Sequence, residues 1–206
     1  MKRLIFIMAV GMITGVQAQT KSLLMDHENF FRFGVKGGLN LNKISGTSYK
    51  SGFNYNFQLG GFLQFNVTNR IGIQPELSFV QSKAEFSSDG TDIYDDIFGG
   101  GNQHKASLNY LEIPVLLNVN IGISKRVKFQ IGPAYGGLLK STVDSLQTGI
   151  RPYKNSEWSA IAGFWLQLPL VNGGIRYKYG ITNVNAIDNR EAWHNQAVQI
   201  FVGLTF

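Results

Sequence analysis

Apolar and polar residues alternate one for one along most of the chain, and this period of two constrains the fold more than any other feature. In FFRFGVKGGLNL (residues 30–41), Phe33, Val35 and Leu39 occupy odd positions, whereas Lys36 and Asn40 occupy even ones. Successive side chains of a β-strand point to opposite faces, whereas a helical face repeats every 3.6 residues. After residue 19 no helical periodicity persists for three turns, so the pattern predicts an all-β protein.

Eight alternating runs follow one another, and their connections alternate in length. We expect strands at residues 31–41, 53–67, 71–79, 109–121, 127–139, 158–168, 175–181 and 198–206. Short turns are expected at 68–70, 122–126 and 171–174, the last on the tight-turn dipeptide Asn172-Gly173. Long polar connections are expected at 43–52, 87–105, 141–157 and 183–194. An even number of strands joined this way predicts an antiparallel up-and-down barrel.

Four prolines are unusual residues for the strands expected here. Pro75, Pro114 and Pro133 fall inside the expected strands, and Pro169 falls at the end of the one expected at 158–168. Proline has no backbone N–H to donate to a neighbouring strand, so central strands rarely contain it. We interpret these positions as bulges or local breaks in the pairing.

The alternation alone does not say whether the apolar face points inward or outward. Only 16% of the residues are charged, 13% are aromatic, and there are 24 glycines. The interior of an eight-stranded barrel holds little more than its own side chains, and the aromatic residues of eight strands would overfill it. We therefore expect an eight-stranded transmembrane β-barrel with its apolar face toward lipid.

This orientation makes two further predictions about side chains. The mid-strand charges should pack inside, where mutual pairing offsets their desolvation; they are Arg32, Lys36, Glu76, Glu112, Lys128, Arg176 and Lys178. Aromatic residues near strand ends should form girdles at the membrane interfaces; the candidates are Tyr55, Phe65, Trp158, Tyr177 and Tyr179.

The first 18 residues have the three-part layout of a secretory signal peptide. Lys2 and Arg3 precede an apolar run from residue 4 to 16, and VQA ends at Ala18, the expected cleavage point. The alternative, a membrane anchor, needs roughly 20 apolar residues. We expect residues 1–18 to be removed and residues 19–206 to form one outer-membrane barrel domain. Its termini would be periplasmic and its long loops extracellular.

Few residues suggest chemistry. The absence of cysteine excludes disulfides, thiolate metal sites and a lipoprotein anchor. No cluster of lysine and arginine with interleaved aromatics points to nucleic acid. Loop residues could form a serine hydrolase set; the candidates are Ser87, Ser107 and His104, and His194 near Asp188 and Glu191. The acidic string 89–96 resembles a calcium-binding loop but lacks the regular ligand spacing of such loops. We assign no catalytic, cofactor-binding or metal-binding residue.

Three functions remain open at this point. The first is a non-enzymatic structural or interaction protein that acts through long extracellular loops or as a subunit of an envelope complex. Loop 87–105, with Ile93, Tyr94, Ile97 and Phe98, is its candidate docking surface. The second is a narrow channel for small solutes, and the third is a membrane-embedded enzyme acting on lipid. A general porin is not expected, because long side chains would fill an eight-stranded lumen.

The final stretch, AVQIFVGLTF, alternates up to the terminal Phe206. It resembles the C-terminal signal that the outer-membrane assembly machinery recognises, and we expect this strand to close on the first one. The chain also resembles the PorT-like outer-membrane β-barrel family of Bacteroidetes, often labelled "porin family". The motifs that carry this resemblance are FGVKGGLNLNKISG, YLEIPVLL, FQIGPAYGGLL and GIRYKYGITNV. The resemblance implies the fold and the location, and it brings no shared catalytic residues.

Overall fold

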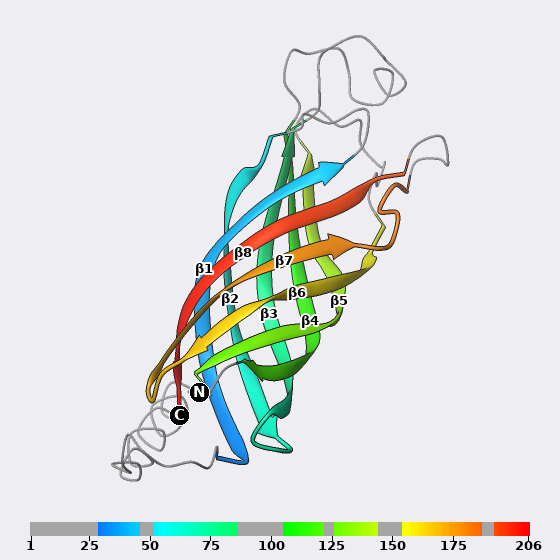
Figure 1. The fold of residues 1–206 in the computed structure, drawn as a ribbon. Helices are drawn as coiled ribbons and strands as arrows, with labels where there is room; N and C mark the ends of the chain where they lie inside the picture. The colour runs from blue at the N-terminus through cyan, green and yellow to red at the C-terminus, as the bar shows by residue number, and fades with distance from the viewer. Residues whose placement is uncertain (1–28, 46–51, 86–104, 122–125, 144–153, 187–191) are drawn as a thin grey trace, which may run out of the picture.

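Eight antiparallel strands close into one barrel in sequence order (Figure 1). The computed structural model describes residues 29–45, 52–85, 105–121, 126–143, 154–186 and 192–206. The strands are β1 (Phe31–Ser45), β2 (Asn54–Asn66), β3 (Ile71–Glu85), β4 (Lys105–Ile121), β5 (Val127–Val143), β6 (Ser156–Gln167), β7 (Val171–Gly180) and β8 (His194–Thr205). The expected eight-stranded barrel is confirmed. Among the described residues, no helix is long and apolar enough to cross a membrane.

The last strand closes the barrel on the first, as the sequence predicts. β8 pairs with β1 from Gly34↔Thr205 to Ser45↔His194. The pairing continues to the final residue, because the Phe206 N–H donates to the Phe33 carbonyl at 2.7 Å and the Phe33 N–H donates to the Phe206 carbonyl at 3.2 Å. The C-terminal residue is therefore part of the sheet.

One expected turn lies in the wrong place. β7 already begins at Val171, so residues 171–174 belong to a strand, and the turn is formed by residues 168–170. The Leu168 N–H closes this turn on the Val171 carbonyl at 2.9 Å. The apolar residues Leu168 and Leu170 read as strand in the sequence, but Pro169 between them has no N–H for a ladder. Asn172 points into the barrel instead and donates to Thr205 Oγ1 at 2.9 Å.

The other three prolines lie inside strands without shifting them. Opposite Pro75, the β2–β3 pairing passes from Phe62↔Glu76 to Phe65↔Ile73 in unchanged register, with two pairs missing between them. The same two-pair gap occurs beside Pro114 and beside Pro133. The prolines are thus local breaks and not bulges, because each lost N–H removes pairing on one side only.

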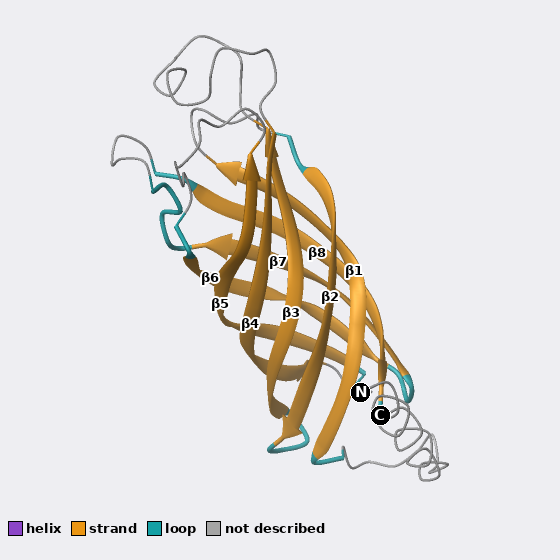
Figure 2. Ribbon diagram, turned by 180° about the vertical axis from the view of Figure 1, so that it is seen from behind, coloured by secondary structure: helices purple, strands orange, loops and turns teal. Residues whose placement is uncertain are grey.

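The strands differ in length, and the barrel wall is therefore uneven (Figure 2). β3, β4 and β5 have 15, 17 and 17 residues, whereas β6, β7 and β8 have 12, 10 and 12. A strand of about 9–11 residues suffices to cross a bilayer. The β3–β5 wall extends past this length at the end of the barrel opposite Phe206 (Figure 1).

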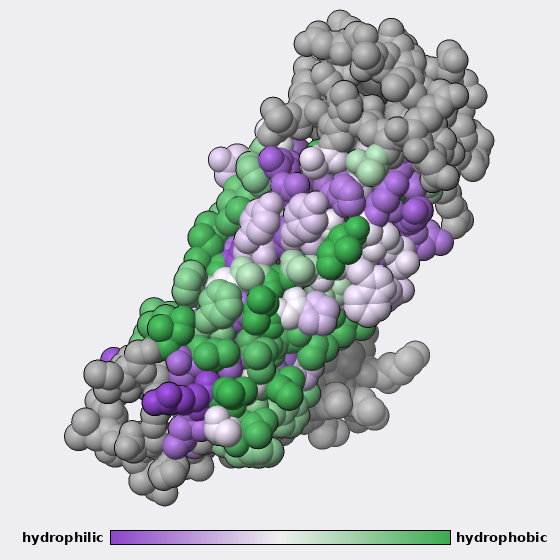
Figure 3. Space-filling model, turned by 45° about the vertical axis from the view of Figure 1, so that its right-hand side comes forward, coloured by the Kyte–Doolittle hydropathy of each residue, from purple (hydrophilic) through white to green (hydrophobic). Residues whose placement is uncertain are grey.

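Apolar side chains cover the outside of the barrel and polar ones fill the inside. Leu59 and Val202 are 62% and 67% exposed, whereas Gln74 and Gln130 in the lumen are fully buried. Figure 3 shows the apolar surface over the lower barrel and a more polar surface toward the other end. This arrangement confirms that the apolar face points outward, where it can meet lipid.

Candidate functional site

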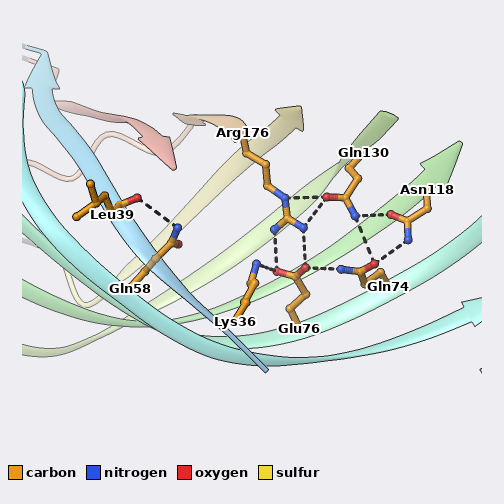
Figure 4. Close-up of polar contacts among 8 residues, drawn as sticks. All are labelled: Lys36, Leu39, Gln58, Gln74, Glu76, Asn118, Gln130 and Arg176. Atoms are coloured by element: carbon orange, nitrogen blue, oxygen red, sulfur yellow. Dashed lines mark hydrogen bonds and ion pairs between the residues drawn. The ribbon is translucent and has the colours of Figure 1, made fainter. Parts of the chain in front are cut away.

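The centre of the lumen holds an ion-paired cluster contributed by three strands. Glu76 of β3 accepts hydrogen bonds from Arg176 of β7 at 2.9 and 2.8 Å, so the guanidinium binds both carboxylate oxygens. Lys36 of β1 donates to the same carboxylate at 2.6 Å. Glycines on the lumen face of these strands leave room for such long side chains. All three charges are buried and face one another (Figure 4).

Amide side chains continue this cluster along the inner wall. Gln74 donates to Glu76 at 2.7 Å and accepts from Asn118 at 2.7 Å. Gln130 accepts from Arg176 Nε at 2.8 Å and donates to Asn118 at 2.7 Å. Gln74, Glu76, Asn118, Gln130 and Arg176 form one hydrogen-bonded network across β3, β4, β5 and β7 (Figure 4). Hydrogen bonds of this kind offset the free-energy cost of burying charged side chains.

Three buried aromatic rings pack together in the lumen beside this network. Phe62 and Trp165 meet edge to face with ring centroids 5.0 Å apart, and Phe201 lies 5.4 Å from Trp165. The Arg176 guanidinium lies over Phe201 at 4.6 Å and over Trp165 at 5.5 Å. The rings therefore pack against a cation, an arrangement that stabilises both.

Glycines on neighbouring strands make the space for these rings. Phe62 pairs directly with Gly34, and a Cβ on Gly34 would lie 2.6 Å from the Phe62 ring. Phe201 pairs with Gly174 on one side and Gly38 on the other. A Cβ on Gly174 would lie 2.6 Å from the Phe201 ring. The glycines of the polar face thus accommodate aromatic rings as well as charged side chains.

A second ion cluster lies closer to the end of the barrel opposite Phe206. Lys178 contacts Glu112 at 2.5 Å and Glu157 at 3.5 Å, so two carboxylates share one ammonium. Asn195 donates to Glu157 at 3.2 Å. All four side chains are buried. Glu157 was not among the expected lumen charges, because residue 157 ends the long polar connection expected at 141–157, although Glu157 directly precedes the outward-facing Trp158.

These lumen groups are arranged for mutual pairing. The three lumen carboxylates are each engaged by a cation from another strand. Within the described ranges, no group of three or more histidine and acidic residues could hold a metal ion. The expected pairing of Lys36, Glu76, Glu112, Arg176 and Lys178 inside the barrel is confirmed.

The structure describes two of the candidate hydrolase residues, Ser107 and His194. Ser107 lies in β4, where it pairs with Lys83. The His194 ring stacks on Tyr179 at 5.9 Å, and its Nδ1 lies 2.9 Å from the Gly180 carbonyl. The remaining candidates fall outside the described residues: Ser87, His104, Asp188, Glu191, the acidic string 89–96 and most of the docking loop 87–105. The same holds for the signal peptide, residues 1–18.

Several solved structures share this fold at low sequence identity. Ail, the attachment invasion locus protein of Yersinia pestis, matches with a TM-score of 0.53 and 15% identity over 86% of this chain and 100% of Ail. OprG from Pseudomonas aeruginosa matches with a TM-score of 0.52 and 12% identity over 88% and 99%. Neisserial surface protein A matches with a TM-score of 0.51 and 13% identity over 86% and 98%. At these identities the likeness concerns the fold alone.

The family comparison is more specific. A search of the curated proteins gave no match. The family model for the outer membrane protein beta-barrel domain matches residues 17–185, most of the chain. That match, the closed eight-stranded barrel and the apolar outer surface agree with one another. The chain therefore belongs to the outer membrane protein beta-barrel domain family and is a small eight-stranded barrel of the outer membrane.

Proposed function

We propose that this protein is a closed, non-conducting and non-enzymatic barrel that serves as a structural or interaction protein of the outer membrane. The observation that carries the proposal is the filled lumen. Phe62, Trp165, Phe201, Glu76 and Arg176 extend into it from five different strands, and each is at most 4% exposed. Ile44, Leu108 and Trp193, near the opposite end from Phe206, are buried as well. A hydrated ion or sugar would have to displace these packed groups.

The proposed interactions occur at the end of the barrel that carries the long connections. The connections at the Phe206 end are short, 67–70 and 168–170, whereas residues 86–104 separate β3 from β4 at the other end. We propose that the short turns and both termini are periplasmic and the long connections extracellular, with loop 87–105 as the partner-binding segment. This orientation agrees with a signal peptide at residues 1–18.

Two finer assignments extend this proposal. We propose that the chain belongs to the PorT-like group of its family, on the motifs YLEIPVLL and GPAYGG. We also propose that the assembly machinery recognises β8 through its terminal Phe206. The pairing of Phe206 with Phe33 supports a role for this residue at the closing seam of the barrel.

A liposome-swelling assay tests the closed lumen. Vesicles that contain the wild-type protein should swell in arabinose no faster than empty vesicles. The triple variant Phe62→Ala, Trp165→Ala, Phe201→Ala removes the aromatic closure, and it should admit the sugar if it still inserts. Rapid swelling with the wild type would support the narrow-channel alternative. Lipid hydrolysis or acyl transfer by the purified wild type would support the enzyme alternative.

A further inference from the structure

The outward faces of β3 and β4 change from apolar to polar toward the end of the barrel opposite Phe206. On β3 it is apolar at Ile71, Ile73, Leu77 and Phe79, and then continues with Gln81 and Lys83. On β4 the apolar positions run from Ile121 back to Leu111 and are followed by Asn109 and Ser107. The apolar part of β3 has the length that crosses a bilayer, about 9 residues. The polar residues beyond it therefore lie at the depth of lipid headgroups.

Strand register brings five of these polar residues together. Gln81 pairs with Asn109, which pairs with Lys140 of β5. In the next row Lys83 pairs with Ser107. We call these five residues the rim patch. Lys83 and Lys140, on either side of β4, are both exposed.

A register shift places Lys140 in this patch. On β5, the outward residues are odd-numbered up to Tyr135, which is 39% exposed. The pairing with β4 shifts between Asn109 and Tyr110, so that Asn109 faces Lys140 while Tyr110 faces Leu138. Tyr110 is buried in the lumen, whereas Asn109 next to it, on the opposite face of β4, is half-buried. The irregularity therefore turns the even-numbered Lys140 to the outer surface.

Asparagines of β1 hold the patch in place from inside the barrel. The β2–β3 pairing ends at Gln58↔Val80, below the patch. Beyond that point the Asn42 side chain makes the two hydrogen bonds to Lys83 that a paired β2 residue would make. Its Nδ2 donates to the Lys83 carbonyl at 2.9 Å, and its Oδ1 accepts from the Lys83 N–H at 3.1 Å. Asn40 donates to the Gln81 carbonyl at 2.8 Å. On the side of β3 that faces away from β4, side chains of β1 therefore hold this backbone, and Asn54 of β2 adds a hydrogen bond to the Lys83 carbonyl at 3.2 Å.

Of the carboxylate side chains that the structure describes on the strands, none lies beside the patch. Glu76, Glu112 and Glu157 are buried and ion-paired in the lumen. By contrast with β3 and β5, no lysine or arginine points outward from β6, β7 or β8, each described in full. Among these five strands, the cations at this level of the outer wall are therefore Lys83 and Lys140.

We propose that the rim patch binds the phosphate-bearing headgroup of an anionic lipid in the adjacent leaflet. Lysine side chains at the edge of an apolar surface keep their ammonium groups at headgroup level, where they attract lipid phosphates. Gln81, Asn109 and Ser107 supply neutral hydrogen-bond donors between the two cations. The patch lies on the outer wall of the barrel, so the proposal depends neither on a protein partner nor on whether the lumen conducts.

Lipid titration of the detergent-solubilised mature protein, followed by native mass spectrometry, tests the proposal. The probes are phosphatidylglycerol, which has a net negative phosphate, and phosphatidylcholine, which is zwitterionic. The wild type should prefer phosphatidylglycerol. Each of K83Q and K140Q should weaken that binding about fivefold, and the double variant about thirtyfold. Binding of phosphatidylcholine should be unchanged.

The matched control removes two exposed cations from the other end of the barrel. R70Q/R126Q changes the net charge by the same amount and should leave phosphatidylglycerol binding unaltered. Every variant must keep a heat-modifiable gel shift, which shows that the barrel is folded. An equal loss in R70Q/R126Q, an unchanged affinity in K83Q/K140Q, or equal binding of both lipids by the wild type would overturn the proposal. Tighter binding of polyglutamate than of phosphatidylglycerol would also overturn it, in favour of an acidic protein partner.

Discussion

Arg176 and Glu76 meet across the lumen through two parallel contacts of 2.9 and 2.8 Å, although 100 positions separate them in the sequence. Neither side chain has any exposed surface. Lys36 adds a second cation to the same carboxylate. The pair therefore joins β3 to β7, strands that are not neighbours in the barrel wall.

Removal of Glu76 should destabilise the barrel strongly. Glu76→Ala leaves Arg176 and Lys36 buried without their carboxylate, and breaking a buried pair in this way costs about 3–5 kcal/mol. The free energy of unfolding in urea, measured in detergent micelles, checks the prediction. Gln81→Ala, on the same strand but on its outward face, is the control. A loss below about 1 kcal/mol would show that the pair is not important for stability.

The two carboxylates that share Lys178 should respond differently to neutralisation. Glu112→Gln removes the partner at 2.5 Å, whereas Glu157→Gln removes the one at 3.5 Å, which also accepts from Asn195. One ammonium balances one carboxylate, so Glu157 carries the surplus negative charge. Glu112→Gln should lower the free energy of unfolding by about 3 kcal/mol, and Glu157→Gln should leave it unchanged or raise it. Equal losses in the two variants would contradict this assignment.

Glycine at position 34 should be required for the closing seam of the barrel. A Cβ there would lie 2.2 Å from the Leu204 carbonyl and 2.6 Å from the Phe62 ring. Gly34→Ala should therefore cost about 1–3 kcal/mol through overpacking. Gly61→Ala is the control, because its Cβ would meet nothing closer than 3.5 Å. Unfolding midpoints in urea compare the two, and equal midpoints would show that the seam can widen.

Phe206→Ala should separate a recognition role from a structural one. The substitution keeps the two backbone hydrogen bonds to Phe33 and removes the ring that packs on Phe33 at 5.6 Å. Refolding into detergent should therefore remain close to that of the wild type. Insertion into the outer membrane of living cells, measured by fractionation and the heat-modifiable gel shift, should fall. Normal insertion in cells would argue against recognition through Phe206.

Much of the barrel could be predicted from the sequence because lipid and lumen place opposite demands on alternate residues. The apolar series Ile71, Ile73, Leu77 and Phe79 and the polar series Gln74, Glu76 and Ser78 separate cleanly in β3. Strand ends were harder to place. Lys43, Ser45 and Ser141 are polar enough to read as loop residues, yet β1 continues to Ser45 and β5 to Val143.

The buried aromatic cluster was not predicted, because all large aromatic residues were expected to face lipid. Phe62, Trp165 and Phe201 share the parity of the polar face, in phase with Gln64, Gln167 and Gln199. Each has a glycine two positions away on that face: Gly60, Gly163 and Gly203. This spacing is a usable sequence signal. The partners of the buried charges could not be predicted, since pairing across the lumen depends on the shear of the closed barrel.

Single-channel recording in planar lipid bilayers tests the central claim, a lumen closed by side chains, most directly. The wild-type protein, with insertion verified by its heat-modifiable gel shift, should give no stable conductance above the bare bilayer. The variant Trp165→Ala, Arg176→Ala, Phe201→Ala, which removes the central cation and two of the rings, should show discrete openings. Large and stable conductance from the wild type would contradict the closed lumen and identify the protein as a channel.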